Sequence, residues 1–448
     1  MKRIFTYALL LAVAGAFTVS FTSCSEDNDN SAERRKVQNE ELQSLTTRYV
    51  NEVVFPTYTN LANEADNLYK KIAELKTKVK AGTTVTQSEI DAICTNYKVA
   101  RSHWEESEAW LYGAASDFDI DPNIDTWPLV VPTLASDLQN NTKMAKLDNQ
   151  SDLGYIAVIT DMAEENRGFH GIEFIFFRDG KNRNVTFFND GSKETFKEKD
   201  GSQPFAGKNV TAKEELIFAT AAAAYLRDRV YQLEVAWRGD NATPAHKTRL
   251  DACKAAYPDI FKVTVGNSNL SYGANMLAAN TGTSTYQTWR KAVEAILVAG
   301  CSNICSEVAN QKMGQAYRSA IGKPETHKDE NGNDVVDDPN YIESPYSYNS
   351  FTDFYGNIMS IQNALYGNLN KDKYESNSII AYLQKYNSEM ANNLQNKLTA
   401  ALDALKACQN SGTSFVKDPG ATYVKTAMDK IGDLDKALNE SANWILAN

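Results

Sequence analysis

The chain has 448 residues, of which 42% are hydrophobic, and a formal net charge of −11 at pH 7. This length allows roughly two to three globular domains at about 150 residues each, with ample core. No lysine- or arginine-rich cluster stands out against the acidic background. The composition therefore argues against a nucleic-acid partner and favours cationic ligands.

The N-terminus has the pattern of a secretory signal peptide. Lys2 and Arg3 precede an uncharged apolar stretch, which ends in F-T-S-C at Cys24. A cysteine at this junction resembles a bacterial lipobox, in which the thiol is acylated and becomes the new N-terminus. We expect residues 1–23 to be removed, Cys24 to carry the lipid, and residues 24–36 to form an acidic, solvated tether. A signal anchor with an accidental cysteine is the alternative.

The leader and the remaining hydrophobicity bear on location. We find no second uncharged apolar run of the roughly 20 residues that span a bilayer, so we expect membrane attachment through the lipid alone. The expected location is the outer membrane, on either its periplasmic or its cell-surface face.

Of the other cysteines, Cys301 and Cys305 are four residues apart, which suits a metal pair. No second close pair completes such a site, and small buried side chains are the preferred interpretation.

Apolar periodicity predicts an all-α protein. Hydrophobic residues recur every three or four positions over residues 49–79, with Pro56 as a kink, and again over residues 383–405. Further helices are predicted over residues 87–112, 150–176, 212–237, 285–318, 350–366 and 420–446. The few β-branched runs, at residues 185–188 and 261–265, are too short to build a sheet.

Two polar stretches rich in Gly, Asn and Asp, residues 178–209 and 322–340, are predicted to be loops. The first divides the chain into two halves, each with enough helix for a bundle of about four. We expect a first bundle over residues 37–205 and a second over residues 206–448.

One of only four histidines lies in an unusually apolar run, R-G-F-H-G-I-E-F-I-F-F, over residues 167–177. On a helix, positions three apart share a face, so His170 and Glu173 can present an imidazole and a carboxylate to one point. Gly168 and Gly171 remove bulk beside them. A buried histidine paired with a nearby carboxylate is the structural alternative, since two ligands alone define no metal site.

More carboxylates lie upstream among aromatic residues. In R-S-H-W-E-E-S-E-A-W, Glu105 and Glu108 share a helical face, and D-F-D-I-D-P-N-I-D-T-W-P follows with Asp125. Acids beside tryptophans suggest a packed interface, although a solvated acidic face gives the same pattern.

The segment G-F-H-G-I-E matches the G-x-H-x-x-E signature of the imelysin family, also classed as peptidase family M75. Supporting segments occur in the family's order. They are V-V-F-P-T-Y (residues 53–58), W-E-E-S-E-A-W (104–110), I-D-T-W-P (124–128), G-C-x-x-I-x-x-E-V (300–308) and E-S-P-Y-S-Y-N-S (343–350). The resemblance covers nearly the whole chain after the leader.

This resemblance implies an all-helical, extracytoplasmic protein of two bundle-like halves, linked to iron uptake and to possible outer-membrane uptake proteins. The positions that match the family's motifs imply these metal ligands: His170, Glu173, Glu105, Glu108 and Asp125. Asp119 and Asp121 are alternatives to Asp125.

Three functions follow as hypotheses. The first is a lipoprotein that binds iron or zinc through oxygen donors and one imidazole. The second is an M75-type metallopeptidase, in which His170 and Glu173 would be catalytic. It lacks the second histidine of H-E-x-x-H. The third is a haem- or protein-binding module with a structural G-x-H-x-x-E.

Overall fold

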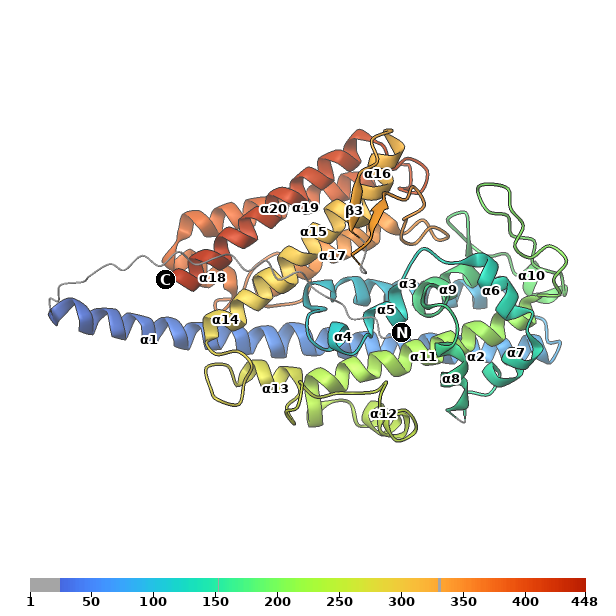
Figure 1. Cartoon of the computed structure of the whole chain (residues 1–448), viewed down its shortest axis with the longest axis horizontal. Helices are drawn as coiled ribbons and strands as arrows, with labels where there is room; N and C mark the ends of the chain where they lie inside the picture. Colours follow the sequence, from blue (N-terminus) through green and yellow to red (C-terminus); the bar gives the residue numbers. More distant parts are fainter. Residues whose placement is uncertain (1–24, 152, 329–331) are drawn as a thin grey trace.

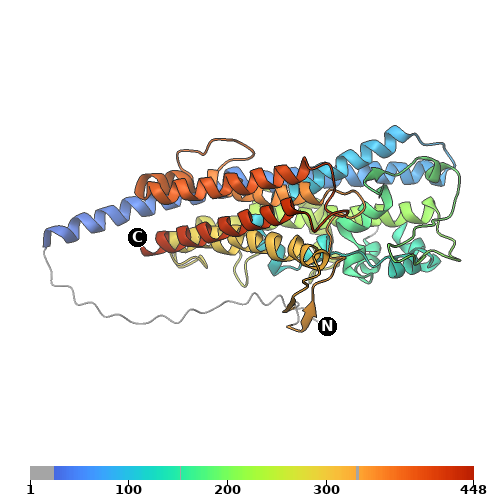
Figure 2. The same cartoon turned by 90° about the horizontal axis from the view of Figure 1, so that it is seen from above.

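The computed structural model describes residues 25–151, 153–328 and 332–448; the predicted signal peptide and Cys24 lie outside them. The described chain forms an elongated body whose main helices run roughly along its long axis, as Figure 1 and, from above, Figure 2 show. Its strands form only two short antiparallel pairs. The predicted all-α fold is confirmed.

A single helical run opens the described chain. It comprises α1 (Ser25–Arg48), the π-helical η1 (Tyr49–Val54) and α2 (Phe55–Lys80). Residues 25–36 are therefore helical, where the sequence predicts a tether. Acidic residues interact favourably with the start of a helix, and the sequence A-E-R-R-K that follows consists of good helix formers. The irregularity expected at Pro56 is the π-helical turn just before it.

The first group of helices packs around α2. It contains α3 (Gln87–Glu105), α9 (Gly168–Phe176) and α11 (Ala212–Arg238), of which α11 has the most extensive contact with α2. Capping boxes at Thr86 and Thr211 start α3 and α11, each with the glutamate three residues later. The alanine-rich middle of α11 is buried on all sides, so that neighbouring helices approach it closely.

The boundary predicted between residues 205 and 206 does not separate the two groups. Helix α11 follows it in sequence and yet packs along α2 and α9 (Figure 1). Because α11 is buried on every face, other helices have to pack on all sides of it. The polar loop before α11 does not indicate this packing. The first group extends to α12 (Pro244–Ala256) and α13 (Tyr272–Leu277), which contact α11.

The second group begins with another irregular helical run. Its parts are α14 (Trp289–Glu294), η5 (Ala295–Ser302), α15 (Asn303–Glu307), η6 (Val308–Lys312) and α16 (Gly314–Ala320), of which η5 and η6 are π-helical. The others are α17 (Ser350–Tyr366), α18 (Ile379–Tyr386), α19 (Ser388–Gln409) and α20 (Thr422–Ala447). Helix α20 packs on α19 and on the irregular run, and α17 reaches across to α3.

The run Trp289–Ala320 is long and apolar enough to cross a membrane by length and composition alone. The expectation that only the leader could do so is therefore wrong on that criterion. In the folded chain, 61% of its most apolar window is buried against other helices. It is a core helix of the second group.

Short elements fill the connections. The helix predicted over residues 150–176 forms three pieces, and the last break lies where Arg167 is extended and Gly168 has a φ of +75°. The short helices are η2 (Glu108–Trp110), α4 (Ala114–Asp117), α5 (Asp121–Asp125), α6 (Val131–Leu138), α7 (Asn141–Leu147), α8 (Gly154–Thr160), η3 (Glu164–Asn166), α10 (Thr186–Asn189) and η4 (Gly239–Asn241). The strand pairs are β1 (Phe177–Arg178) with β2 (Lys181–Asn182), and β3 (Thr326–Lys328) with β4 (Asp334–Val336). They lie in or at the edge of the two predicted loops.

Candidate metal centre

His170 lies at the centre of a buried polar cluster. It projects from α9, is 1% exposed, and places Nε2 3.1 Å from Oδ1 of Asp125 on α5 and Nδ1 3.5 Å from Oε2 of Glu173. Trp127 covers it, with ring centroids 5.8 Å apart. The imidazole is thus held between two carboxylates from different elements.

The two glycines of the motif allow this arrangement by their lack of a side chain. A Cβ on Gly168 would lie 2.1 Å from the carbonyl oxygen of Ile124 in α5, and its φ of +75° disfavours any other residue. A Cβ on Gly171 would lie 2.3 Å from the carbonyl oxygen of Asn166. The two glycines therefore let α5 and the turn before α9 approach closely enough to join Asp125 to His170.

Glu173 connects the motif to the second group of helices. Its Oε1 accepts hydrogen bonds from the backbone N–H of Tyr346 at 3.1 Å and of Ser347 at 2.7 Å, and from the Ser347 hydroxyl at 2.6 Å. Its other oxygen faces His170. Glu173 therefore anchors the segment before α17 and orients the imidazole.

Arg101 on α3 neutralises part of the acid cluster. It forms an ion pair with Asp125, and its Nη2 lies 2.5 Å from both Glu105 Oε1 and Glu343 Oε1. The Trp104 indole N–H donates to the other oxygen of Asp125 at 2.6 Å. Asp125 is thus held by three neighbours, counting His170.

Lys312, the last residue of η6, supplies a second buried cation. Its Nζ lies 3.2 Å from Glu343, 3.4 Å from Glu108 and 4.0 Å from Glu105. Asn357 on α17 donates to Glu105 Oε2 at 2.6 Å. The second group therefore contributes Glu343, Lys312 and Asn357 to a cluster that the first group begins.

The charges of Asp125 and His170 reinforce one another. Burial would raise the pKa of Asp125, but Arg101 and His170 outweigh it and hold that pKa below its usual value. Burial would lower the pKa of His170, but Asp125 and Glu173 outweigh it and raise that pKa to about 9. Without a metal the two form a charged pair at neutral pH.

Three further acids of the cluster, Glu105, Glu108 and Asp353, hold protons more tightly than usual. Burial raises the pKa of Glu105 and of Glu108 well above its ordinary range, although Arg101 and Lys312 oppose it. Burial also raises the pKa of Asp353 to about 7. Desolvated carboxylates of like charge cannot all ionise without more positive charge.

Two sets of donor atoms lie close enough to share one ion. They are Asp125 with His170 and Glu343, and Glu105 with Glu108 and Asp125; within each set the candidate atoms are within 4.8 Å of one another. Among the described residues, the Oε2 atom of Glu343 has no hydrogen-bond partner. The residues thus fit a small cation bound by oxygen and one nitrogen.

The structure brings together most of the predicted candidates. Glu105, Glu108, Asp125, His170 and Glu173 are all buried in the same cluster. Of the rivals, Asp119 is exposed and Asp121 is half-buried, and Asp125 is the one that contacts His170.

Arg101, Glu343, Lys312, Asp353 and Asn357 belong to the cluster but are not predicted from the sequence. Arg101 stands four residues before Glu105, a spacing that pairs opposite charges on a helix. Glu343 opens the segment E-S-P-Y, which helped to identify the family but suggested no role. Lys312 has no sequence neighbour that indicates a role in the cluster.

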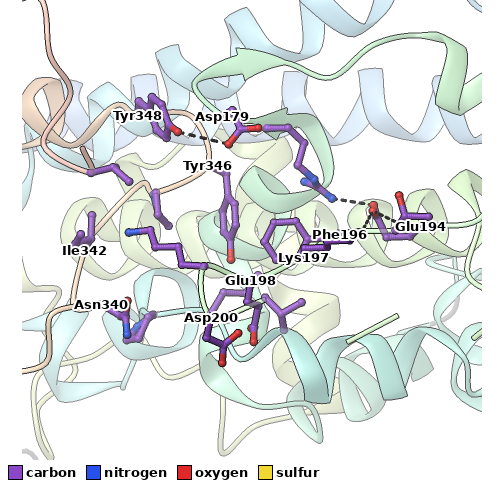
Figure 3. Close-up of a pocket in the computed structure, with 18 of the residues that line it drawn as sticks. Asp179, Glu194, Phe196, Lys197, Glu198, Asp200, Asn340, Ile342, Tyr346 and Tyr348 are labelled. Atoms are coloured by element: carbon purple, nitrogen blue, oxygen red, sulfur yellow. Dashed lines mark hydrogen bonds and ion pairs between the residues drawn. The ribbon is translucent and has the colours of Figure 1, made fainter. Parts of the chain in front are cut away.

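A cavity of about 1050 Å³ lies beside the cluster, between residues 193–200 and residues 338–348. Figure 3 shows Tyr346 reaching into it, with Glu198, Phe196 and Lys197 around. Its wall includes Pro128, next to the tryptophan that covers His170. The backbone N–H of Tyr346 donates to Glu173, so Tyr346 contacts both the cavity and the cluster.

The cysteines do not take part. Cys301 and Cys305 are buried in the second group, and burial raises the pKa of each thiol. Neither belongs to the candidate donor sets found among the described residues. Their surroundings favour the compact, apolar role expected of them.

Comparison with known proteins gives one consistent result. The sequence model described as imelysin (peptidase M75) matches residues 55–440. A relative from Synechococcus elongatus, named iron-regulated protein A, is 24% identical over 433 residues, which cover 96% of this chain and 91% of the relative.

Two solved structures share the fold. One, described as a putative iron-regulated protein A precursor from Parabacteroides distasonis, has a TM-score of 0.66 at 22% identity, and the alignment covers 90% of this chain and 95% of that one. The other, an imelysin-like protein from Psychrobacter arcticum, has a TM-score of 0.53 at 13% identity, with 91% and 96% covered. The G-x-H-x-x-E residues lie in a buried cluster between two groups of helices, and the family model matches residues 55–440 of the chain. The chain therefore belongs to the imelysin family.

Proposed function

We propose that this protein binds an iron ion as cargo in extracytoplasmic iron acquisition, at the cluster around His170. The observation that carries the proposal is the convergence of Asp125, His170 and Glu343 donor atoms in a buried site. Carboxylate oxygens with one imidazole suit ferrous or ferric iron, and also zinc. A relative named iron-regulated protein A supports the choice of iron.

Each residue would have a distinct role in such a site. Asp125, Glu343 and the Nε2 atom of His170 would hold the ion, and Glu105 and Glu108 would form the second donor set. Glu173, which faces Nδ1, would fix the orientation of the imidazole, as outer partners of metal-bound histidines commonly do. This differs from the prediction of Glu173 as a direct ligand.

The charge balance of the cluster also favours a cation. Its buried cations are Arg101, Lys312 and, when protonated, His170. The acids outnumber them; they are Glu105, Glu108, Asp125, Glu173, Glu343 and Asp353. An ion that replaces bound protons would relieve this repulsion, so binding should weaken as the pH falls.

Titration calorimetry with ferrous, ferric and zinc ions tests the proposal. We expect His170→Ala and Glu343→Gln to weaken binding at least about tenfold, because each removes a ligand. His246→Ala is the matched control. His246 is also buried and pairs with Glu234 at 2.5 Å, a carboxylate outside the cluster. Equal affinities of all four proteins would refute the site.

A metallopeptidase is the alternative function. It would require a peptide to reach His170, yet that residue is 1% exposed and Glu173 already accepts three hydrogen bonds. We therefore favour binding over catalysis. Metal-loaded protein should leave unstructured peptides intact; cleavage that Glu173→Gln abolishes would reverse this ranking.

The third function is binding of a haem-bearing or other protein, with the G-x-H-x-x-E motif in a structural role. Failure of the protein to bind any metal ion would favour this function.

We further propose that Cys24 carries the lipid that anchors the protein to the outer membrane. The support is the leader sequence that ends at this cysteine. Labelling with a palmitate analogue should modify the wild type, and Cys24→Ala should be unlabelled and leave the membrane fraction. A Cys24→Ala protein that loses its signal peptide and stays membrane-bound would contradict the anchor. Protease treatment of intact cells would distinguish the two faces.

A further inference from the structure

The position of Lys312 bears on how tightly the proposed site can hold an ion. Its side chain is 1% exposed, and its ammonium contacts carboxylates of both candidate donor sets. These are Glu343 in one set, at 3.2 Å, and Glu108 in the other, at 3.4 Å. The positive charge of Lys312 therefore compensates the same oxygens that a metal ion would need.

Arg101 is a different kind of counter-ion. It lies on α3, four residues before Glu105, and pairs with Asp125 of the same group of helices and with Glu343 of the second group. Its rigid, planar guanidinium makes several fixed contacts at once. Arg101 is thus a fixed part of the cluster's framework.

Lys312 comes from the second group, on a flexible stem. It ends the π-helical η6, and segments of this type occur often at functional sites. Its Nζ also lies 4.9 Å from the centroid of the Trp127 ring, which covers His170. A lysine ammonium is a compact charge on a rotatable chain, so it can leave the carboxylates without moving the backbone.

We propose that Lys312 is a tethered cation that competes with the bound metal ion for Glu108 and Glu343 and so keeps the site's affinity low enough for release. The inference rests on the proposed function. When the ion arrives, it replaces the ammonium as the counter-charge of these carboxylates. When it leaves, the ammonium returns and the cluster stays neutralised.

The variant Lys312→Met tests this, because methionine keeps an unbranched side chain and removes the charge. We expect ferrous and zinc ions to bind Lys312→Met about ten- to a hundredfold more tightly than wild type, since like charges a few ångströms apart repel strongly in a buried site. The metal should also raise the melting temperature of the variant by more than that of wild type. Lys312→Gln serves as a second variant if the methionine protein does not fold.

Lys76→Met is the matched control. Lys76 is also buried and binds the carboxylate of Asp148 at 3.1 Å, near the C-terminal end of α2 and outside the cluster. The affinity of this variant for either ion should equal that of wild type.

The outcomes separate the two proposals. If wild type and the Lys312 variants bind an ion equally well, the inference is overturned while the metal site stands. If none of them binds, the proposed function fails and the inference with it. If only the Lys312 variants bind, the ammonium blocks the site, which supports the competition.

Discussion

Position 168 has no room for a side chain, and its backbone φ of +75° favours glycine. We predict that Gly168→Ala lowers the free energy of unfolding by about 2–4 kcal/mol, from the left-handed φ and the clash with the Ile124 carbonyl together. Gly191→Ala is the control, because Gly191 has a similar φ of +69° and no other group within 4 Å of the place that an added methyl would take. It should cost about 1–2 kcal/mol. Equal losses in urea unfolding would show that the contact with α5 does not matter.

The residues of the site are predictable to different degrees. The pair His170 and Glu173 follows from helical spacing, and Glu105 with Glu108 follows from the same rule. Glu343 and Lys312 are not predictable from local pattern, because only the packing of the second group on the first brings Lys312 to Glu105 and Glu108 and brings Glu343 to Arg101. The role of Glu173 also needs the structure, since its hydrogen-bond donors are more than 170 positions away in the chain.

Among the elements, the loop of residues 178–209 shows how charge holds an irregular segment in place. Glu194 pairs with Arg183 and lies 2.9 Å from Arg178. Burial would raise the pKa of Glu194, but the two arginines outweigh it and lower that pKa to about 2. A depressed carboxyl pKa stabilises the fold above the unfolded value, near pH ~4.3, and the stabilisation is lost as the pH falls towards about 2.

We therefore predict that acid loosens this loop and that Glu194→Gln loosens it at every pH. Hydrogen exchange of the loop amides between about pH 3 and 7 measures the effect, after correction for the intrinsic rate. In Glu194→Gln, the loop amides should be weakly protected from exchange, and their protection should not change with pH through the titration of residue 194. A Glu194→Gln protein with the wild-type pH profile would contradict the assignment.

The same loop should be the first site of proteolysis. Residues 197–203 are exposed apart from the half-buried Glu198, whereas Phe188 and Phe205 on either side are buried. Trypsin should cut at Lys197 or Lys199 before any helix, because exposed loop tips are preferred sites. The hairpin of β3 and β4 should be cleaved next. First cleavage within α11 would contradict this packing.

The elements themselves follow the apolar periodicity well. The long helices α2, α11, α19 and α20 match predicted stretches closely. The stretch predicted as one helix over residues 150–176 is broken at Arg167 and Gly168, where the chain has to turn towards α5. The tether predicted over residues 24–36 was not predicted to be helical, because helix propensity and solvation by charge use the same residues, Glu, Lys and Arg.

For the whole molecule, the site depends on both groups of helices. Asp125 and His170 come from the first, and Glu343 and Lys312 from the second. The sequence pattern places the division at the first long loop, but α11, which follows that loop, packs back onto α2. Anything that shifts one group against the other should change the donor sets and the counter-ions together.

We propose that an iron ion binds between Asp125, His170 and Glu343. A crystal structure of protein soaked with ferrous iron, with anomalous scattering recorded on both sides of the iron edge, tests it most directly. We predict an anomalous peak about 2.0–2.3 Å from His170 Nε2 and from carboxylate oxygens of Asp125 and Glu343, with the Lys312 ammonium displaced. An iron peak elsewhere, or none while Arg101 and Lys312 keep their ion pairs, would contradict it.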